Sequence, residues 1–176
     1  MRVIRKTKPR SRHQISIGSQ TERVPASLKT ALRSVIALLS IKRCQWHIEI
    51  VNDVEMGALH QQYLNLPTTT DVLTFDLRDD ITTSNEGSAV ILDTVICADE
   101  AERRAIELGH STDHELLLYC IHSLLHVQGY DDRTKAGAAR MHAREDALLE
   151  ALGVGAVYRS RKQKLPPAPR RKRAVP

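Results

Sequence analysis

Hydrophobic and polar residues follow two kinds of spacing along the chain. Alternation of apolar and polar positions predicts strands, and apolar positions three and four residues apart predict amphipathic helices. The predicted strands are 13–19, 46–52, 71–77 and 89–98. The predicted helices are 25–42, 53–66, 99–109, 111–129 and 136–152. Strands interspersed with helices in this order predict an α+β domain, with a small mixed β-sheet packed with helices.

The ends of the predicted helices carry their own signals. Asp53 is the predicted N-terminal cap of the second helix, and Thr112 with Glu115 fits a capping box at the start of the fourth. Gly109 and Gly129 are predicted to end the third and fourth helices, because glycine readily adopts the left-handed backbone conformation of a helix stop.

Charge divides the 176 residues into three predicted parts. Residues 1–12 form a basic extension with six Lys and Arg, and residues 158–176 form a basic, proline-rich tail with eight; neither carries an acid. Residues 13–157 are the predicted domain, with 12 basic against 21 acidic residues. Proline and like charge predict a disordered tail. Basic ends favour a polyanion such as nucleic acid, although they could also serve only to keep the protein soluble.

The cysteines and the hydropathy narrow the class of protein. Three cysteines, none in a CxxC pair, make neither a disulfide framework nor a sulfur-ligated zinc site, and they predict reduced thiols. No run of residues is apolar enough to span a bilayer, and the basic N-terminus lacks the apolar stretch of a signal peptide. A cytoplasmic protein without a membrane partner is expected.

Two histidines four residues apart are the main chemical signal. His122 and His126 lie one turn apart on one face of the fourth predicted helix. Gly129 lets the chain turn back, so Asp131 or Asp132 can supply a third ligand. Two imidazoles and a carboxylate, with one position open to water, are the ligand set of a catalytic zinc. Such an ion lowers the pKa of water to about 7 and so supplies hydroxide at neutral pH.

Histidines within an apolar helix are more often core residues than ligands. The glycine exit and the carboxylates beyond it favour the metal site here. His47, His60, His114 and His142 are predicted to lie on the surface, and His110 in a loop.

The segment "HSLLHVQGYDD" (122–132) resembles the signature of the YbeY family of metal-dependent endoribonucleases. Three further segments are similar to family motifs: "TDVLTF" (70–75), "LDTVICADEA" (92–101) and "MHAREDALLEALG" (141–153). The resemblance covers roughly residues 46–153. It implies that residues 13–157 form a YbeY-like metallo-endoribonuclease domain with a zincin-like metal-dependent hydrolase fold.

The resemblance also implies the roles of individual residues. His122 and His126 match the first two metal positions, and Asp132 stands at the third, where the family has histidine. Asp131 matches an aspartate that is expected to orient a ligand or the turn. One zinc ion per chain is expected, with metal-activated water attacking a phosphodiester of single-stranded RNA. The implied task is small-subunit ribosomal RNA 3′-end maturation and ribosome quality control, with the small ribosomal subunit and assembly factors as partners.

One departure from the family concerns the substrate. Leu64 stands where the family carries an arginine implicated in activity, and leucine cannot bind a phosphate. Arg78, Thr70 and Asp71 are the candidate substrate-binding residues. Two alternatives are a catalytically weakened or inactive metal-binding ribosome-assembly factor, and a zincin-type peptidase. Ser123 disfavours the peptidase, because it replaces the glutamate that serves those enzymes as general base.

Overall fold

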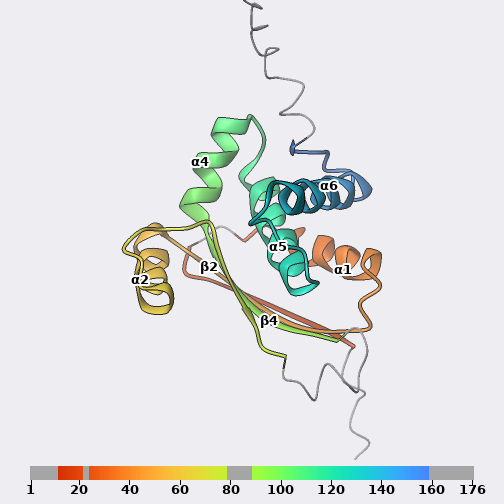
Figure 1. Ribbon diagram of the computed structural model, residues 1–176, viewed down its shortest axis with the longest axis horizontal. Helices are drawn as coiled ribbons and strands as arrows, with labels where there is room; N and C mark the ends of the chain where they lie inside the picture. The colour runs from red at the N-terminus through yellow and green to blue at the C-terminus, as the bar shows by residue number, and fades with distance from the viewer. Residues whose placement is uncertain (1–11, 22–23, 79–88, 159–176) are drawn as a thin grey trace, which may run out of the picture.

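The structure is a computed structural model that describes residues 12–21, 24–78 and 89–158 (Figure 1). The strands are β1 (His13–Ser19), β2 (Arg43–Val51), β3 (Val72–Asp76) and β4 (Ala89–Cys97). The helices are α1 (Leu28–Leu38), α2 (Asp53–Leu64), α4 (Ala98–Leu108), α5 (Thr112–Val127) and α6 (Lys135–Ala151). Each predicted element has a counterpart, and the α+β class is confirmed. The predicted basic extension and tail lie almost entirely outside the described residues.

The sheet is mixed, as predicted. Its strand order is β1-β2-β4-β3, with β1, β2 and β4 parallel and β3 antiparallel to β4. Figure 1 shows α1, α5 and α6 together on one side of the sheet and α2 on the other. The main core fills the first side, whereas α2 covers a smaller cluster formed by Val51, Met56, Leu73 and Cys97. In this strand order β3 pairs with β4 alone among the described strands, so it lies at an edge of the sheet.

Helix α5 is the central element of the core. Twelve of its 16 residues are buried. From His114 to Val127, the only residues that are not buried are His122 and His126. The rotation of α5 in the core thus presents these two side chains, and no others from that stretch, to the outside. No helix in the described ranges is long and apolar enough to cross a bilayer.

Two predicted caps are wrong by one residue. Ser111, not Thr112, caps α5 by accepting the His114 N–H at 3.2 Å, and Asn52, not Asp53, caps α2 by accepting the Glu55 N–H at 3.0 Å. In both cases the capping residue has the extended backbone that precedes a helix, while the predicted residue is already helical.

The structure confirms some of the other local predictions and contradicts others. Both glycine stops are confirmed, with φ of 74° at Gly109 and 91° at Gly129. The surface prediction for two histidines is wrong, because His60 and His114 are both buried. His60 is held inside by a hydrogen bond of 2.6 Å between its Nδ1 and the Thr68 carbonyl.

A buried chain of polar groups fixes α5 against the sheet. The Trp46 indole N–H donates to the Thr94 hydroxyl at 2.9 Å, and that hydroxyl is bonded to the Ser123 hydroxyl at 2.7 Å. Thr74 on β3 donates to Ser123 at 2.8 Å. Because Trp46, Thr94 and Ser123 are all buried, each depends on these bonds for its polar group. The bonds join β2, β3 and β4 to the residue that follows His122.

Replacement of Thr94 by valine is expected to lower the free energy of unfolding by about 1–3 kcal/mol, because the buried Trp46 N–H loses its acceptor. Urea unfolding in the presence of a chelator measures this loss. Thr74→Val is the matched control, since Thr74 is only half-buried and its loss should be below about 1 kcal/mol. Equal losses in the two variants would contradict the assigned dependence of Trp46 on Thr94.

Candidate metal centre

Three side chains converge at the end of α5. The Nε2 atoms of His122 and His126 lie 2.9 Å apart, and oxygens of Asp132 lie 3.8 Å from the first and 3.9 Å from the second. One ligand atom from each residue lies within 4.8 Å of the others. Ligand atoms around a tetrahedral zinc lie about 3.4 Å apart, so the three side chains approach the spacing of such a site. The structure thus brings together the three residues predicted as metal ligands.

His122 is oriented by a residue that the sequence analysis did not single out. Oε1 of Glu145, on α6, lies 2.7 Å from Nδ1 of His122, and Glu145 is fully buried. This contact leaves Nε2 of His122 directed toward His126 and Asp132. A carboxylate behind a histidine is the common way to fix the ring and raise its basicity at a metal site. The sequence signals for Glu145 were its place in the segment 141–153, which resembles a family motif, and its position one turn beyond Met141 on the mostly apolar face of that helix.

The second oxygen of Glu145 supports the presence of a cation. Oε2 is buried and makes no hydrogen bond within the described residues. A buried carboxylate is costly unless positive charge compensates it. Burial by itself lowers the pKa of His122, but the hydrogen bond and charge of Glu145 together with the charges of Asp71 and Asp132 raise it, and the net direction is upward. Positive charge at His122, from a proton or from a metal ion, therefore stabilises Glu145.

His126 is oriented by the backbone of the turn. Its Nδ1 lies 3.1 Å from the carbonyl oxygen of Tyr130, and the Tyr130 N–H donates to the Leu125 carbonyl at 3.0 Å. The left-handed Gly129 makes this return of the chain possible. Each histidine thus has one ring nitrogen engaged by an oxygen and the other facing Asp132.

The loop that carries Asp132 is packed against the start of α6. The Thr134 hydroxyl caps α6 by accepting the Gly137 N–H at 3.0 Å. A Cβ atom at position 137 would lie 2.1 Å from the carbonyl oxygen of Asp131, so only glycine permits this approach. The Asp131 carboxylate itself accepts hydrogen bonds from the backbone N–H and the guanidinium of Arg133, which lowers the pKa of Asp131. Its contacts therefore lie within the turn rather than with a histidine.

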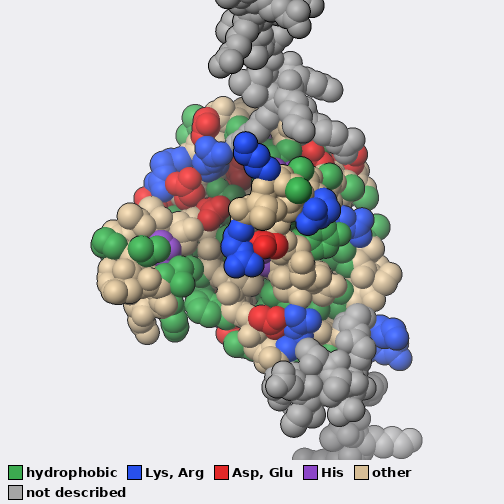
Figure 2. All heavy atoms as spheres, in the orientation of Figure 1, with side chains coloured by type: hydrophobic (Ala, Val, Ile, Leu, Met, Phe, Trp, Pro, Cys, Tyr) green, Lys and Arg blue, Asp and Glu red, His purple; other side chains and the backbone are tan. Residues whose placement is uncertain are grey.

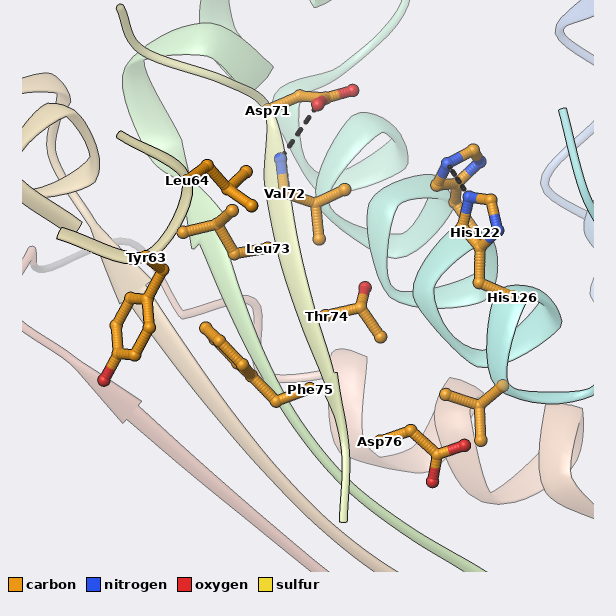
Figure 3. Close-up of a pocket in the computed structure, with 11 residues that line it drawn as sticks. Tyr63, Leu64, Asp71, Val72, Leu73, Thr74, Phe75, Asp76, His122 and His126 are labelled. Atoms are coloured by element: carbon orange, nitrogen blue, oxygen red, sulfur yellow. Dashed lines mark hydrogen bonds between the residues drawn. The ribbon is translucent and has the colours of Figure 1, made fainter. Parts of the chain in front are cut away.

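A cavity of about 470 Å³ opens beside the two histidines. It is lined by His122, His126 and Val127 of α5, by residues 71–76 on and before β3, and by Tyr63 and Leu64 at the end of α2. Figure 3 shows the histidines on one side of β3, with Tyr63 and Leu64 on the other. Leu64 is 53% exposed, so the position that the resemblance assigns to an arginine is an apolar part of the rim.

The three candidate substrate-binding residues occupy different places. Asp71 lines the cavity, and its Oδ1 accepts the Val72 N–H at 2.9 Å (Figure 3) and the Thr70 hydroxyl at 3.0 Å. The Thr70 hydroxyl thus holds the Asp71 carboxylate in place, and Thr70 itself does not line the cavity. Arg78 itself does not line the cavity, but its guanidinium donates to the Val127 carbonyl at 2.7 Å and pairs with Asp76 at 2.5 Å, and both of these partners line it.

Two histidines, a carboxylate and an adjoining cavity are typical of metal-dependent hydrolases. Comparison with known proteins defines the family. The pattern of the family described as Endoribonuclease YbeY matches residues 10–153. The chain therefore belongs to this family, and its membership supports a nuclease function.

Individual relatives agree with this assignment. Endoribonuclease YbeY of Macrococcus caseolyticus is 37% identical over 110 residues, which cover 61% of this chain and 71% of the relative. Endoribonuclease YbeY of Mycobacterium tuberculosis is 33% identical over 132 residues, which cover 71% and 74%. The solution structure of TM1509 from Thermotoga maritima covers 90% of this chain and 99% of its own, with a TM-score of 0.51 and 22% identity. That likeness concerns the fold alone.

Glu145→Gln is expected to weaken zinc binding about 10- to 100-fold, because the amide keeps a hydrogen bond to His122 but removes the negative charge behind it. Competition with a chromophoric chelator measures the affinity. Glu150→Gln, the same substitution at an exposed position of α6, is the control. A zinc affinity equal to that of the wild type would show that Glu145 does not support the site.

Proposed function

We propose that the chain is a single-strand-specific, metal-dependent endoribonuclease of the cytoplasm. The proposed task is ribosomal RNA processing, in particular small-subunit 3′-end maturation, together with ribosome quality control. The observation that carries the proposal is the convergence of His122, His126 and Asp132 beside a cavity, in a chain of an endoribonuclease family. The proposed partners are single-stranded and ribosomal RNA, the small ribosomal subunit and its assembly factors.

The residues fit one zinc ion per chain. His122 and His126 would hold it through Nε2 and Asp132 through its carboxylate. When bound, zinc supplies a water molecule of lowered pKa for attack on a phosphodiester. Glu145 keeps a proton on Nδ1 of His122, and the Tyr130 carbonyl keeps one on Nδ1 of His126, so each Nε2 offers its lone pair to the ion.

The substrate would lie in the cavity beside β3. Asp76 and the Val127 carbonyl hold the Arg78 guanidinium at the cavity end nearest His126. This is the proposed contact for an RNA phosphate, since an arginine can donate to a phosphate oxygen while it keeps its other bonds. Asp71, fixed by Thr70 and the Val72 N–H, is proposed to accept a hydrogen bond from the sugar or base of the nucleotide at the opposite end.

A second candidate is a metal-binding ribosome-assembly factor with weak or no cleavage. Leu64 favours it, because the exposed rim position carries no charge. The charge of Arg78 is moreover partly neutralised by Asp76. Both functions need the metal and RNA, so cleavage itself distinguishes them. A peptidase is not supported, because Ser123 is buried and bonded to Thr74 and Thr94, and position 123 does not face the cavity.

Asp132→Ala is expected to abolish cleavage of a labelled single-stranded RNA, because the variant loses the carboxylate that completes the ligand set. Chelation of the wild-type protein should also stop cleavage, and added zinc should restore it. Asp131→Ala is the control, since the hydrogen bonds of its carboxylate within the described residues go to Arg133, and activity should fall less. A folded, zinc-loaded wild-type protein that does not cut RNA would favour the assembly factor.

Deletion of residues 159–176 is expected to weaken RNA binding and to flatten its dependence on salt, because the eight Lys and Arg of this segment would otherwise release counterions from RNA phosphates. The magnitude of the slope of log affinity against log salt should decrease by up to about 6 for single-stranded RNA. A full-length chain with these eight residues replaced by glutamine separates charge from length. Unchanged affinity in both proteins would contradict a role of the tail in RNA binding.

A further inference from the structure

The cavity beside the histidines reaches a pair of aromatic rings on the other side of β3. Tyr63 and Phe75 line it together with His122 and His126. We propose that Tyr63, held by Phe75, stacks an unpaired base of the RNA, next to the nucleotide whose phosphodiester lies at the histidines. This inference rests on the proposed function, and it assigns a base-binding subsite to the same cavity.

The alternation of side chains along β3 creates the two sides of this cavity. Val72, Thr74 and Asp76 point toward α5, and Leu73 and Phe75 point the other way (Figure 3). Residues from both sets line the one cavity. A ligand that fills it therefore crosses the strand instead of lying on one face of the sheet.

The edge position of β3 leaves room for such a crossing. The strand pairs with β4 on one side, and the sheet order places no described strand on the other. The Asp71 carbonyl accepts the Cys97 N–H, and the Leu77 N–H donates to the Ile91 carbonyl, both at 2.9 Å. Backbone groups alternate in direction along an antiparallel strand, so those of Thr74 face away from β4. A flexible chain can pass over this edge without displacing a neighbouring strand.

The two rings are arranged so that one remains available. Their centroids lie 4.9 Å apart with an interplanar angle of 63°, an edge-to-face contact that fixes the tyrosine ring. Tyr63 is nevertheless 55% exposed. Figure 2 shows hydrophobic side chains gathered over α2, where Tyr63 lies near the helix end, while charged side chains gather over α4. An exposed and oriented aromatic ring is the feature that single-strand binders use as a stacking platform.

The chemistry of this end of the cavity favours a base over a phosphate. Leu64 and Leu73 line the cavity beside the rings, whereas Asp71, Asp76 and the two histidines lie on the α5 side of β3. An apolar surface with an aromatic ring and no cation binds the face of a neutral base rather than a phosphate. Only an unpaired base exposes its face for stacking, so the platform would also select single strands over duplexes.

The test combines a protein variant with a modified RNA. Tyr63→Leu removes the ring but keeps an apolar side chain, and an RNA with one abasic nucleotide removes its partner. A set of oligonucleotides, with the abasic nucleotide moved one position at a time, is measured for affinity and for cleavage rate with the full chain. Replacing the same base with 2-aminopurine reports stacking by fluorescence quenching, independently of cleavage.

The wild-type protein is expected to lose about five- to tenfold in affinity when the abasic nucleotide occupies one particular position near the cleavage site. Tyr63→Leu should show this loss with intact RNA and no further loss with the abasic RNA, and it should abolish the quenching. Tyr63→Trp should bind as the wild type does. Tyr158→Leu, which removes the tyrosine stacked on His142 of α6, is the control and should retain the full abasic penalty.

Failure of the inference can be distinguished from failure of the proposed function. If the wild type cuts RNA and Tyr63→Leu keeps the abasic penalty, the endoribonuclease stands and the platform is refuted; the apolar surface then serves another class of partner. If the wild type binds RNA without cutting it, the proposed cleavage is refuted. The fluorescence quenching then still tests whether Tyr63 stacks a base. If it neither binds nor cuts single-stranded RNA, both are refuted.

Discussion

The orientation of α5 in the core is the constraint on which the site depends. Leucine and isoleucine side chains bury this helix between the sheet and the helices α1 and α6, and the two histidines are the side chains left facing outward along its second half. A rotation of the helix by one residue would bury an imidazole and expose a leucine. The hydroxyl of Ser123, bonded to Thr94 and Thr74, opposes such a rotation because its displacement would leave buried polar groups without partners.

The electrostatics of the site follow from a second buried group. Glu145 places a fully buried carboxylate in the core, and His122 lies between that charge and the cavity. The energetic cost of this buried acid is offset by a positive charge on the imidazole side. The same arrangement makes the imidazole a stronger donor toward an ion, so a feature that is unfavourable for the metal-free fold favours the metal-bound one.

Much of this arrangement could be predicted from the sequence, because it depends on local spacing. The histidine pair and the glycine turn follow from helix geometry. The spacing left both Asp131 and Asp132 open as the third ligand, and the family resemblance assigned Asp132. Glu145 could not be assigned in this way, since its contact with His122 spans 23 residues and depends on how α6 packs on α5. The cap predictions failed by one residue because neighbouring polar residues compete for the same role and backbone conformation decides between them. The burial of His114 likewise reflects packing between helices, which periodicity within one helix does not report.

The contact between Gly137 and the Asp131 carbonyl has a consequence for how the proposed metal site would respond to gain or loss of an ion. This contact joins the loop of Asp132 to the first turn of α6, and Glu145 lies two turns further along the same helix. Asp132 and Glu145, the residue that orients His122, therefore belong to one rigid unit with α6. The two histidines belong to α5. An ion held by both would add a cross-link between two helices that already pack together through buried side chains of the main core. Loss of the ion would first weaken the packing of α6 on α5. The resistance of α6 to proteolysis and hydrogen exchange would therefore report the occupancy of the site.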